Sequence, residues 1–111
     1  MSIYEKIRKN EEYSSVYRLK KSKANRLLVM YVAPNGREYS RFGISVSKKV
    51  GNSVVRHHIK RLVKEAYRKK EAVFGCGHDI VVVARKSAEK ADYHQVESAL
   101  LHLKKLHHIN E

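Results

Sequence analysis

The segment Asp79 to Arg85 (DIVVVAR) constrains the fold most, because its centre is an unbroken run of β-branched residues. Such a run is typical of a strand that is buried on both faces. A strand of this kind needs neighbouring strands in a sheet and packed layers above and below that sheet. The rest of the chain must therefore supply further strands and the helices that cover them.

The first half of the chain predicts a helix and two strands. Residues 10–17 have apolar and tyrosine side chains at helical spacing. Residues 27–33 (LLVMYVA) form a short apolar run, and residues 39–47 (YSRFGISVS) alternate between apolar and polar side chains. The sequence Pro-Asn-Gly at 34–36 is typical of a turn, so we interpret the two strands as an antiparallel hairpin. Residues 20–25 look like a basic connection.

The second half predicts two longer helices around the buried strand. Residues 51–70 carry a core-facing stripe at helical spacing, with Val63 beside Val55, Ile59, Leu62 and Ala66. Asp92 is a good cap for a last helix that extends to Leu106. The order is α-β-β-α-β-α, which indicates the α+β class with a single mixed β-sheet sandwiched by helices. We expect one domain over 1–111, because the sequence shows no repeat and no linker.

The charge points to a polyanionic partner. The chain has 24 Lys and Arg against 11 Asp and Glu, a formal net charge of +13. Such an excess repels itself in a folded protein, and a nucleic acid relieves that repulsion. Cys76 is the only cysteine, which suits a reducing cytoplasm. No apolar run approaches the roughly 20 residues of a membrane span, and the first residues lack the apolar core of a secretory signal.

The cations are concentrated on and just before the helix predicted at 51–70. Helical geometry places Lys60, Lys64, Arg68, Arg61 and His57 within about 60° of the pole opposite the core stripe. Glu65 is the only acid among them. An ordinary solvated helix face mixes both signs of charge, so this face favours phosphate binding. Tyr13, Tyr17 and Tyr31 have two readings that the residues alone leave open, core packing or a stacking platform for unpaired bases.

The segment 41–62 (RFGISVSKKVGNSVVRHHIKRL) closely resembles the signature of the bacterial ribonuclease P protein component. The resemblance extends to residues 9–13 (KNEEY), 24–26 (ANR) and 79–86 (DIVVVARK), so it covers nearly the whole chain in order. It implies a left-handed βαβ crossover. It also implies a non-catalytic subunit of an endoribonuclease, which binds the catalytic RNA and the 5′ leader of precursor tRNA while that leader is removed. Mg²⁺ would be held mainly by RNA, and no obligate protein partner is implied.

The resemblance also implies two sets of site residues. For the catalytic RNA, the resemblance implies Arg56, Lys60, Arg61 and Lys64. The cationic helix and the residues just before it add Lys48, Asn52, His57, His58 and Arg68 to this set. The set implied to bind the leader is Tyr13, Tyr17, Tyr31, Lys49 and Arg85. Where the family has Arg-Asn-Arg, this chain has Arg-His-His at 56–58. An imidazole titrates near neutral pH whereas a guanidinium does not, so we expect RNA affinity to fall more steeply between about pH 6 and about pH 8 than in a relative with arginine at position 58.

Two other functions compete with this one, namely cleavage of RNA by the chain itself and general RNA binding. Cleavage of RNA by the chain itself needs acid and base groups on opposite sides of one phosphate. His57 and His58 diverge by about 100° on a helix and cannot flank a phosphate together. We therefore name no catalytic residue. Cys76 and His78 offer only two ligands for a metal site, so we name no metal ligand either. A general RNA-binding or ribosomal-type protein without a role in tRNA cleavage remains an alternative on physical grounds.

Overall fold

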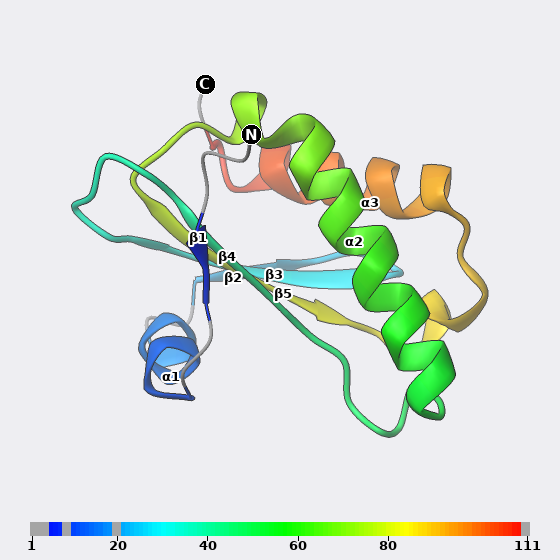
Figure 1. The fold of residues 1–111 in the computed structure, drawn as a ribbon. Helices are drawn as coiled ribbons and strands as arrows, with labels where there is room; N and C mark the ends of the chain where they lie inside the picture. Colours follow the sequence, from blue (N-terminus) through cyan, green and yellow to red (C-terminus); the bar gives the residue numbers. More distant parts are fainter. Residues whose placement is uncertain (1–4, 8–9, 19–20, 110–111) are drawn as a thin grey trace.

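The computed structural model describes residues 5–7, 10–18 and 21–109. They form a mixed five-stranded sheet in the order β1–β4–β5–β3–β2, with helices on both of its faces (Figure 1). The strands are β1 (Glu5–Lys6), β2 (Ser22–Ala24), β3 (Leu28–Pro34), β4 (Arg41–Ser45) and β5 (His78–Ala84). Helix α1 (Asn10–Arg18) lies on one face, and α2 (Ser53–Phe74) and α3 (Tyr93–Leu106) lie on the other. The predicted class and the order α-β-β-α-β-α of the main elements are confirmed.

Strand β5 lies at the centre of the sheet, as its β-branched run predicts. It pairs with β3 in antiparallel orientation and with β4 in parallel orientation. Ile80 and Val82 pack into the core under α2 and α3, whereas Val81 packs into the cluster under α1. All three side chains are fully buried. Burial on both faces is therefore confirmed.

The predicted antiparallel hairpin is wrong. The strands over 28–34 and 41–45 both exist, but β5 lies between them. The segment 35–40 instead crosses the beginning of β5, where the Asn35 N–H donates to the Gly77 carbonyl. Gly36 does adopt the positive φ of 67° that a turn uses. The pairing differs because a strand that is apolar on both faces gains most from hydrogen-bonded neighbours on both edges.

Three short elements were not predicted. β1 pairs in parallel with β4, and β2 pairs antiparallel with β3 at the opposite edge of the sheet. A 3₁₀ helix, η1 (Lys86–Lys90), follows β5. β2 lies in the segment that we expected to be a basic connection. Its three side chains are all exposed, so no alternation of burial marks it in the sequence.

The larger core lies between the sheet and helices α2 and α3. Tyr67 of α2 has no exposed surface and stacks on Phe42 of β4 with ring centroids 4.0 Å apart. The ring of Phe74 also packs on Tyr67, tilted by 52°, with the two centroids 5.0 Å apart. Neither Tyr67 nor Phe74 belonged to the predicted stripe. α2 extends to Phe74, beyond the expected end at Lys70, because this aromatic column continues past that point.

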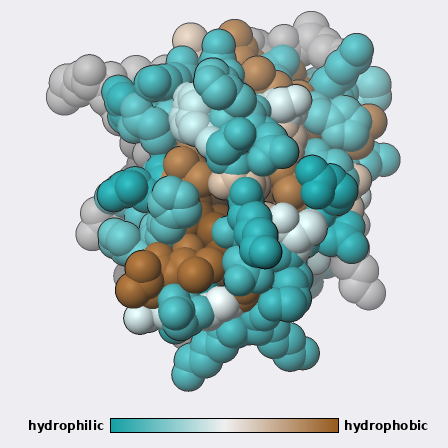
Figure 2. Space-filling view, turned by 90° about the vertical axis from the view of Figure 1, so that its right-hand side faces the viewer, coloured by the Kyte–Doolittle hydropathy of each residue, from teal (hydrophilic) through white to brown (hydrophobic). Residues whose placement is uncertain are grey.

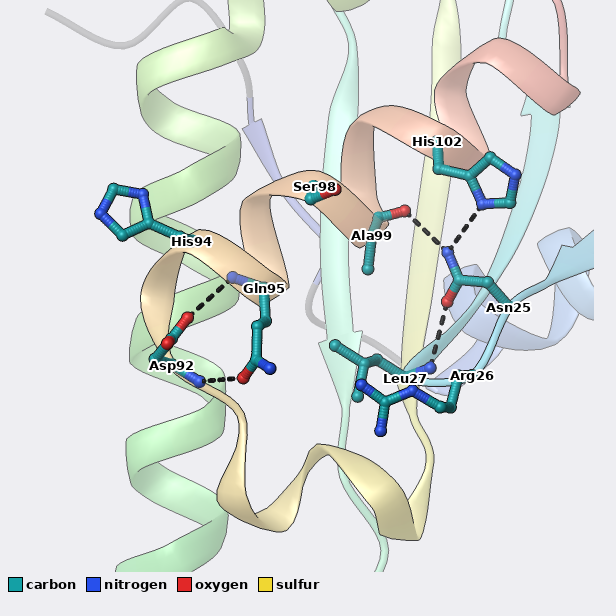
Figure 3. A pocket seen from close by; sticks show the side chains of 9 residues that line it. All are labelled: Asn25, Arg26, Leu27, Asp92, His94, Gln95, Ser98, Ala99 and His102. Carbon is teal, nitrogen blue, oxygen red and sulfur yellow. Dashed lines mark hydrogen bonds between the residues drawn. The ribbon is translucent and has the colours of Figure 1, made fainter.

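Helix α3 is fixed at its beginning and against the β2–β3 connection (Figure 3). Asp92 forms a capping box with Gln95, so the predicted helix cap is confirmed. Asn25 bridges the two elements: its Nδ2 donates to the Ala99 carbonyl at 2.9 Å, and its Oδ1 accepts from the Leu28 N–H at 3.0 Å. This amide holds the start of β3 against α3.

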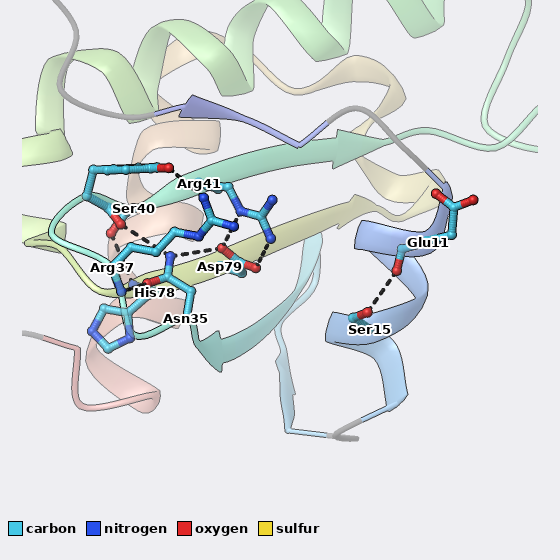
Figure 4. Close-up of polar contacts among 9 residues, drawn as sticks. Glu11, Ser15, Asn35, Arg37, Ser40, Arg41, His78 and Asp79 are labelled. Atoms are coloured by element: carbon cyan, nitrogen blue, oxygen red, sulfur yellow. Dashed lines mark hydrogen bonds and ion pairs between the residues drawn. The ribbon is translucent and has the colours of Figure 1, made fainter.

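A buried ion pair joins the beginnings of β4 and β5 on the α1 side of the sheet (Figure 4). Arg41 Nε donates to Asp79 Oδ1 at 2.8 Å, and Arg41 Nη2 donates to Asp79 Oδ2 at 2.5 Å. Asn35 Nδ2 donates to the same carboxylate at 2.9 Å. Burial raises the pKa of Asp79, but these hydrogen bonds outweigh that effect and hold the pKa below its usual value.

Candidate nucleic-acid interface

Helix α2 carries most of the predicted RNA-binding cations, so its rotation about its own axis decides where they point. Ile59, Val63 and Ala66 are fully buried, whereas Val55 and Leu62 are only half-buried. The centre of the buried face is therefore rotated about the helix axis, away from Val55 and toward Val63, relative to the predicted stripe. The exposed face on the opposite side is rotated with it.

This rotation divides the cations of α2 into two groups. His57, Arg61 and Arg68 are exposed to solvent. Lys60 is half-buried and, together with Lys64, lines a hollow beside β4. The prediction that all five surround the pole opposite the core is wrong for Lys60, which lies on the flank of the helix that faces β4.

Two adjoining hollows of about 320 and 360 Å³ follow the edge of β4 and share Tyr13, Ile44 and Lys60. We call them together the β4 groove. One wall comes from α1, the floor from β4 and the other wall from α2, through Tyr13, Tyr17, Gly43, Ile44, Lys60 and Lys64. In the described chain, β1 pairs with β4 only at Arg41 and Phe42. β1 therefore does not cover the edge of β4 beyond Phe42, and this edge borders the groove.

The ring of Tyr13 lies directly against the backbone of Gly43. A Cβ at position 43 would stand 2.6 Å from the Tyr13 hydroxyl oxygen and 2.8 Å from its Cζ. Only a glycine allows this approach, because those separations are far below van der Waals contact. Gly43 thereby sets how deeply the first tyrosine sits in the groove.

The three predicted tyrosines form one cluster. The ring centroids of Tyr13 and Tyr17 are 6.4 Å apart, and those of Tyr17 and Tyr31 are 4.8 Å apart in an edge-on arrangement. All three are half-buried and pack on the small core that contains Val16 and Val81. Burial raises the pKa of Tyr17, although a hydrogen bond with Ser45 opposes this rise. Tyr13 and Tyr17 line the groove, whereas Tyr31 supports Tyr17 from β3.

The opposite wall is cationic. Lys6 of β1 joins Lys60 and Lys64 around the same hollow. Burial and the charges of Lys6 and Lys60 hold the pKa of Lys64 below its usual value. An anion in the groove would relieve this repulsion. Lys6 was not predicted, because a strand of two residues carries no periodic pattern from which its position could be read.

The beginning of α2 forms a second cationic region. Lys48 and Lys49 are exposed in the turn before the helix. Asn52 is the helix cap, and its Oδ1 accepts from the Val55 N–H at 3.0 Å, so this oxygen is engaged within the protein. Figure 2 shows the side of the molecule on which α2 begins and η1 lies, and hydrophilic side chains cover most of that surface.

Two residues of the predicted leader set lie outside the groove. Arg85 follows the end of β5, and its Nη1 donates to the Asn25 carbonyl at 3.0 Å. Lys49 lies beside the next residue, since Lys86 Nζ donates to the Lys49 carbonyl at 3.3 Å. Both side chains are exposed near the beginning of α2. The structure therefore brings together Tyr13, Tyr17 and Tyr31, but places Lys49 and Arg85 beyond them.

The remaining cations of α2 differ in their exposure and in whether they already bind a group within the protein. Arg68 binds Glu65 through two hydrogen bonds of 2.6 and 3.2 Å, so a phosphate must compete with this carboxylate. Arg56 is half-buried, and its Nε is buried without a hydrogen-bond partner in the described structure. His58 and Arg61 are exposed. Arg61 is thus better placed than Arg68 to bind a phosphate.

The described residues include neither a cluster of metal ligands nor a membrane-spanning helix. Within residues 5–7, 10–18 and 21–109, no three His, Cys, Asp or Glu side chains come together as a metal site would require. None of the helices in those ranges has the length and apolar character of a membrane span.

Comparison with known proteins gives a consistent result. The family model described as Ribonuclease P matches residues 1–107. The ribonuclease P protein component of Lachnoclostridium phytofermentans is 50% identical over 105 residues, which cover 95% of this chain and 90% of that protein. The same component of Alkaliphilus metalliredigens is 48% identical over 103 residues, which cover 93% of each chain.

Solved structures agree with these sequence relatives. The RNase P protein of Staphylococcus aureus superimposes with a TM-score of 0.87 at 34% identity, covering 96% of this chain and 97% of that one. The RNase P protein from Thermotoga maritima has a TM-score of 0.83 at 34% identity, with coverage of 91% and 96%. The family that segment 41–62 suggested is therefore confirmed along nearly the whole chain, and the protein belongs to the ribonuclease P protein component family.

Proposed function

We propose that this chain binds the catalytic RNA of ribonuclease P through the exposed cations of α2 and holds the 5′ leader of precursor tRNA in the β4 groove. It acts in the cytoplasm, in line with its single thiol. The RNA subunit carries out phosphodiester hydrolysis, and the protein positions the substrate. The observation that carries this proposal is the opposition of tyrosine rings on one wall of the groove to lysines on the other.

These walls match the two chemical faces of a single RNA strand. A base that stacks on an aromatic ring gains about 1–3 kcal/mol, largely independent of its sequence. Lys60 and Lys64 lie across the groove from the rings of Tyr13 and Tyr17 and attract the phosphates of the same strand. A double helix cannot offer its base faces in this way, so the groove favours an unpaired leader.

The protein contributes charge and position to cleavage. Its net charge of +13 screens the repulsion between the phosphates of the catalytic RNA and those of the substrate. Cleavage should therefore need less Mg²⁺ when the protein is present. We propose that Mg²⁺ is held mainly by RNA, because the lysines of the groove repel a divalent cation and phosphate oxygens attract one.

The test is reconstitution at low Mg²⁺. Bacterial ribonuclease P RNA cleaves a precursor tRNA with a long or a short leader, with and without the protein, under single-turnover conditions. We expect the protein to restore cleavage, and to restore it more for the long leader. Binding without restored cleavage would instead identify a general RNA-binding protein.

Single variants separate the two parts of the proposal. Tyr17→Ala should reduce the preference for precursor over mature tRNA, because it removes a stacking ring. Tyr39→Ala is the matched control, since Tyr39 is 37% exposed and lies outside the groove. Arg61→Ala should weaken binding of the catalytic RNA and flatten its salt dependence by about 0.7–0.9 in log–log slope. If Tyr17→Ala destabilises the protein but leaves its preference for precursor over mature tRNA intact, Tyr17 belongs to the core alone.

A further inference from the structure

A second cationic hollow lies at the edge of the sheet that is farthest from the β4 groove. Its volume is about 360 Å³, and it is lined by Lys21, Ser22, Lys23, Leu106, His107 and His108. The sheet order β1–β4–β5–β3–β2 puts the groove beside β4 and this hollow beside β2. We call it the β2–α3 hollow. Neither set of predicted site residues includes any of its residues.

The charges around this hollow are not neutralised within the described protein. Lys21 and Lys23 are exposed on and beside β2, and Lys104 and Lys105 lie in the last turn of α3. None of these four lysines forms an ion pair with a carboxylate that the structure describes. The lining residues themselves include no acid. Lys21 and Lys23 therefore face the same space as the two imidazoles that follow α3, and Lys104 and Lys105 lie in the adjoining helical turn.

The two histidines are held in place by the backbone. The Nε2 atom of His107 is 2.8 Å from the Met30 carbonyl oxygen, which fixes this half-buried ring against β3. Burial lowers the pKa of His107, the contact with Met30 opposes this, and the Lys23 charge lowers it further. A bound anion would reverse the effect of Lys23. The charged groups that face the hollow from β2 and α3 are thus all cations or imidazoles.

His108 occupies a backbone position that usually belongs to glycine. Its φ is 55°, and it is the only non-glycine residue with positive φ in the described chain. The residue after it closes the helix, because the Ile109 N–H donates to the Lys104 carbonyl at 3.2 Å. Helices commonly place glycine at this point, since a side chain is strained there. The His108 ring thus stands at a strained backbone position on the rim of a cationic hollow, which points to a role for that ring.

We propose that the β2–α3 hollow is a second contact site for the phosphate backbone of folded RNA, so that the protein lies between two RNA segments. This inference rests on the proposed function. The hollow differs from the groove because its only rings are two imidazoles, and one of them, His107, is held against β3 by its contact with Met30. Its chemistry therefore favours phosphates over unpaired bases. The phosphates come from either the catalytic RNA or the body of the precursor tRNA.

The test compares charge reversals at three positions. Lys23→Glu changes the hollow, Lys60→Glu changes the groove, and Lys90→Glu is a control at an exposed lysine of η1 that lines neither. Binding is measured over a range of salt, first to ribonuclease P RNA alone and then for precursor tRNA on the assembled holoenzyme. We expect Lys23→Glu to weaken one of these steps about threefold to tenfold and to reduce its salt slope by about 0.7–0.9 per lost phosphate contact.

The step that changes identifies the source of the phosphates. A loss in the first step assigns the hollow to the catalytic RNA, and a loss only in the second assigns it to precursor tRNA. If Lys23→Glu matches Lys90→Glu in both steps while Lys60→Glu weakens binding, the hollow proposal is wrong and the groove stands. If Lys60→Glu also has no effect, the proposed function itself fails.

A second variant keeps the test independent of folding. His108→Gly removes the ring but suits the backbone at φ 55°, so the protein should melt at the same or a higher temperature. If the hollow binds phosphates, this variant should bind RNA more weakly in the step that Lys23→Glu affects, although it is no less stable. Unchanged RNA affinity in both variants would overturn the proposal.

Discussion

The two faces of the sheet are covered very differently. Helices of 22 and 14 residues close one face over the larger core, whereas a helix of nine residues covers the other over a much smaller cluster. The column of Phe42, Tyr67 and Phe74 is fully enclosed on the first face. Tyr13 and Tyr17 on the second are only half-buried. The thick face stabilises the fold, and the thin face leaves aromatic surface for a ligand.

The thin face itself has a closed end and an open end. At the closed end, Arg41 and Asp79 form a hydrogen-bonded ion pair that joins β4 to β5. At the open end, along the edge of β4, Tyr13 of α1 faces lysines that come from α2 and β1, with no carboxylate among the groove's lining residues. Charge that is already paired holds strands together, whereas charge that is left unpaired is available to RNA.

The largest effect should come from the thick face. Tyr67→Ala should lower the free energy of unfolding by about 3–5 kcal/mol, because it removes a ring that has no exposed surface and packs on two other rings. Tyr17→Ala makes the same change on the thin face and should lower it by about 1–2 kcal/mol, since that ring is half-buried. Urea unfolding measures both values. Equal losses would contradict the contrast between the faces.

The next effect tests the closed end of the thin face. Asp79→Asn should lower the free energy of unfolding by about 2–3 kcal/mol at neutral pH, because it removes the charge that Arg41 binds. Glu38→Gln, at an exposed loop residue, is the control and should change the free energy by less than about 0.5 kcal/mol.

The lowered pKa of Asp79 also predicts how the free energy of unfolding depends on pH. The pKa of Asp79 is lowered in the folded protein, despite burial, by hydrogen bonds from Arg41 and Asn35. Its contribution is therefore fully present above the unfolded pKa of about 3.9 and is lost as the pH falls through the lower folded value. Unfolding at about pH 7, 5 and 3 should show a smaller decline in Asp79→Asn than in the wild type. Parallel declines would show that the ion pair is not the cause.

A smaller effect should come from the floor of the groove. Gly43→Ala places a Cβ against the Tyr13 ring, so the ring must move. We expect a loss of about 1 kcal/mol in the free energy of unfolding and a weaker preference for long leaders. In the double variant Gly43→Ala/Tyr13→Ala, the loss in the free energy of unfolding should be smaller than the sum of the two single losses. A double-mutant cycle measures this difference. Additive losses would mean that Tyr13 does not depend on Gly43 for its position.

The sequence predicts those parts of the fold that depend on local pattern. The run at 80–83 predicts a strand buried on both faces, and Asp92 predicts the beginning of α3, because each depends on neighbours in the chain. Pairing across the sheet depends on distant residues, so the turn at 34–36 wrongly suggested a hairpin. Tyr67 was missed because a tyrosine in a basic helix gives no sign of the phenylalanine on which it stacks.

The candidate site divides in the same way. The positions of Tyr13 and Tyr17 on one helical face follow from their spacing of four residues, and the structure places both in the groove. Lys6 enters the groove through a strand of two residues, which no periodicity reveals. The small rotation of α2 that brings Lys60 into the groove is set by packing against β4, and a residue-by-residue angle from Val55 cannot detect it.

The smallest effect concerns the exposed face of α2, where this chain has His58 in place of the arginine in the family's motif. His58 is exposed beside the cations that we assign to the catalytic RNA, and an imidazole near phosphates gains charge as the pH falls. Wild-type affinity for ribonuclease P RNA should therefore fall about threefold from about pH 6 to about pH 8, and His58→Arg should remove most of that decline. His94→Arg adds the same charge at an exposed position on α3 and should leave the decline in place. A decline that survives in His58→Arg would have to arise elsewhere, and His58 would then not be its cause.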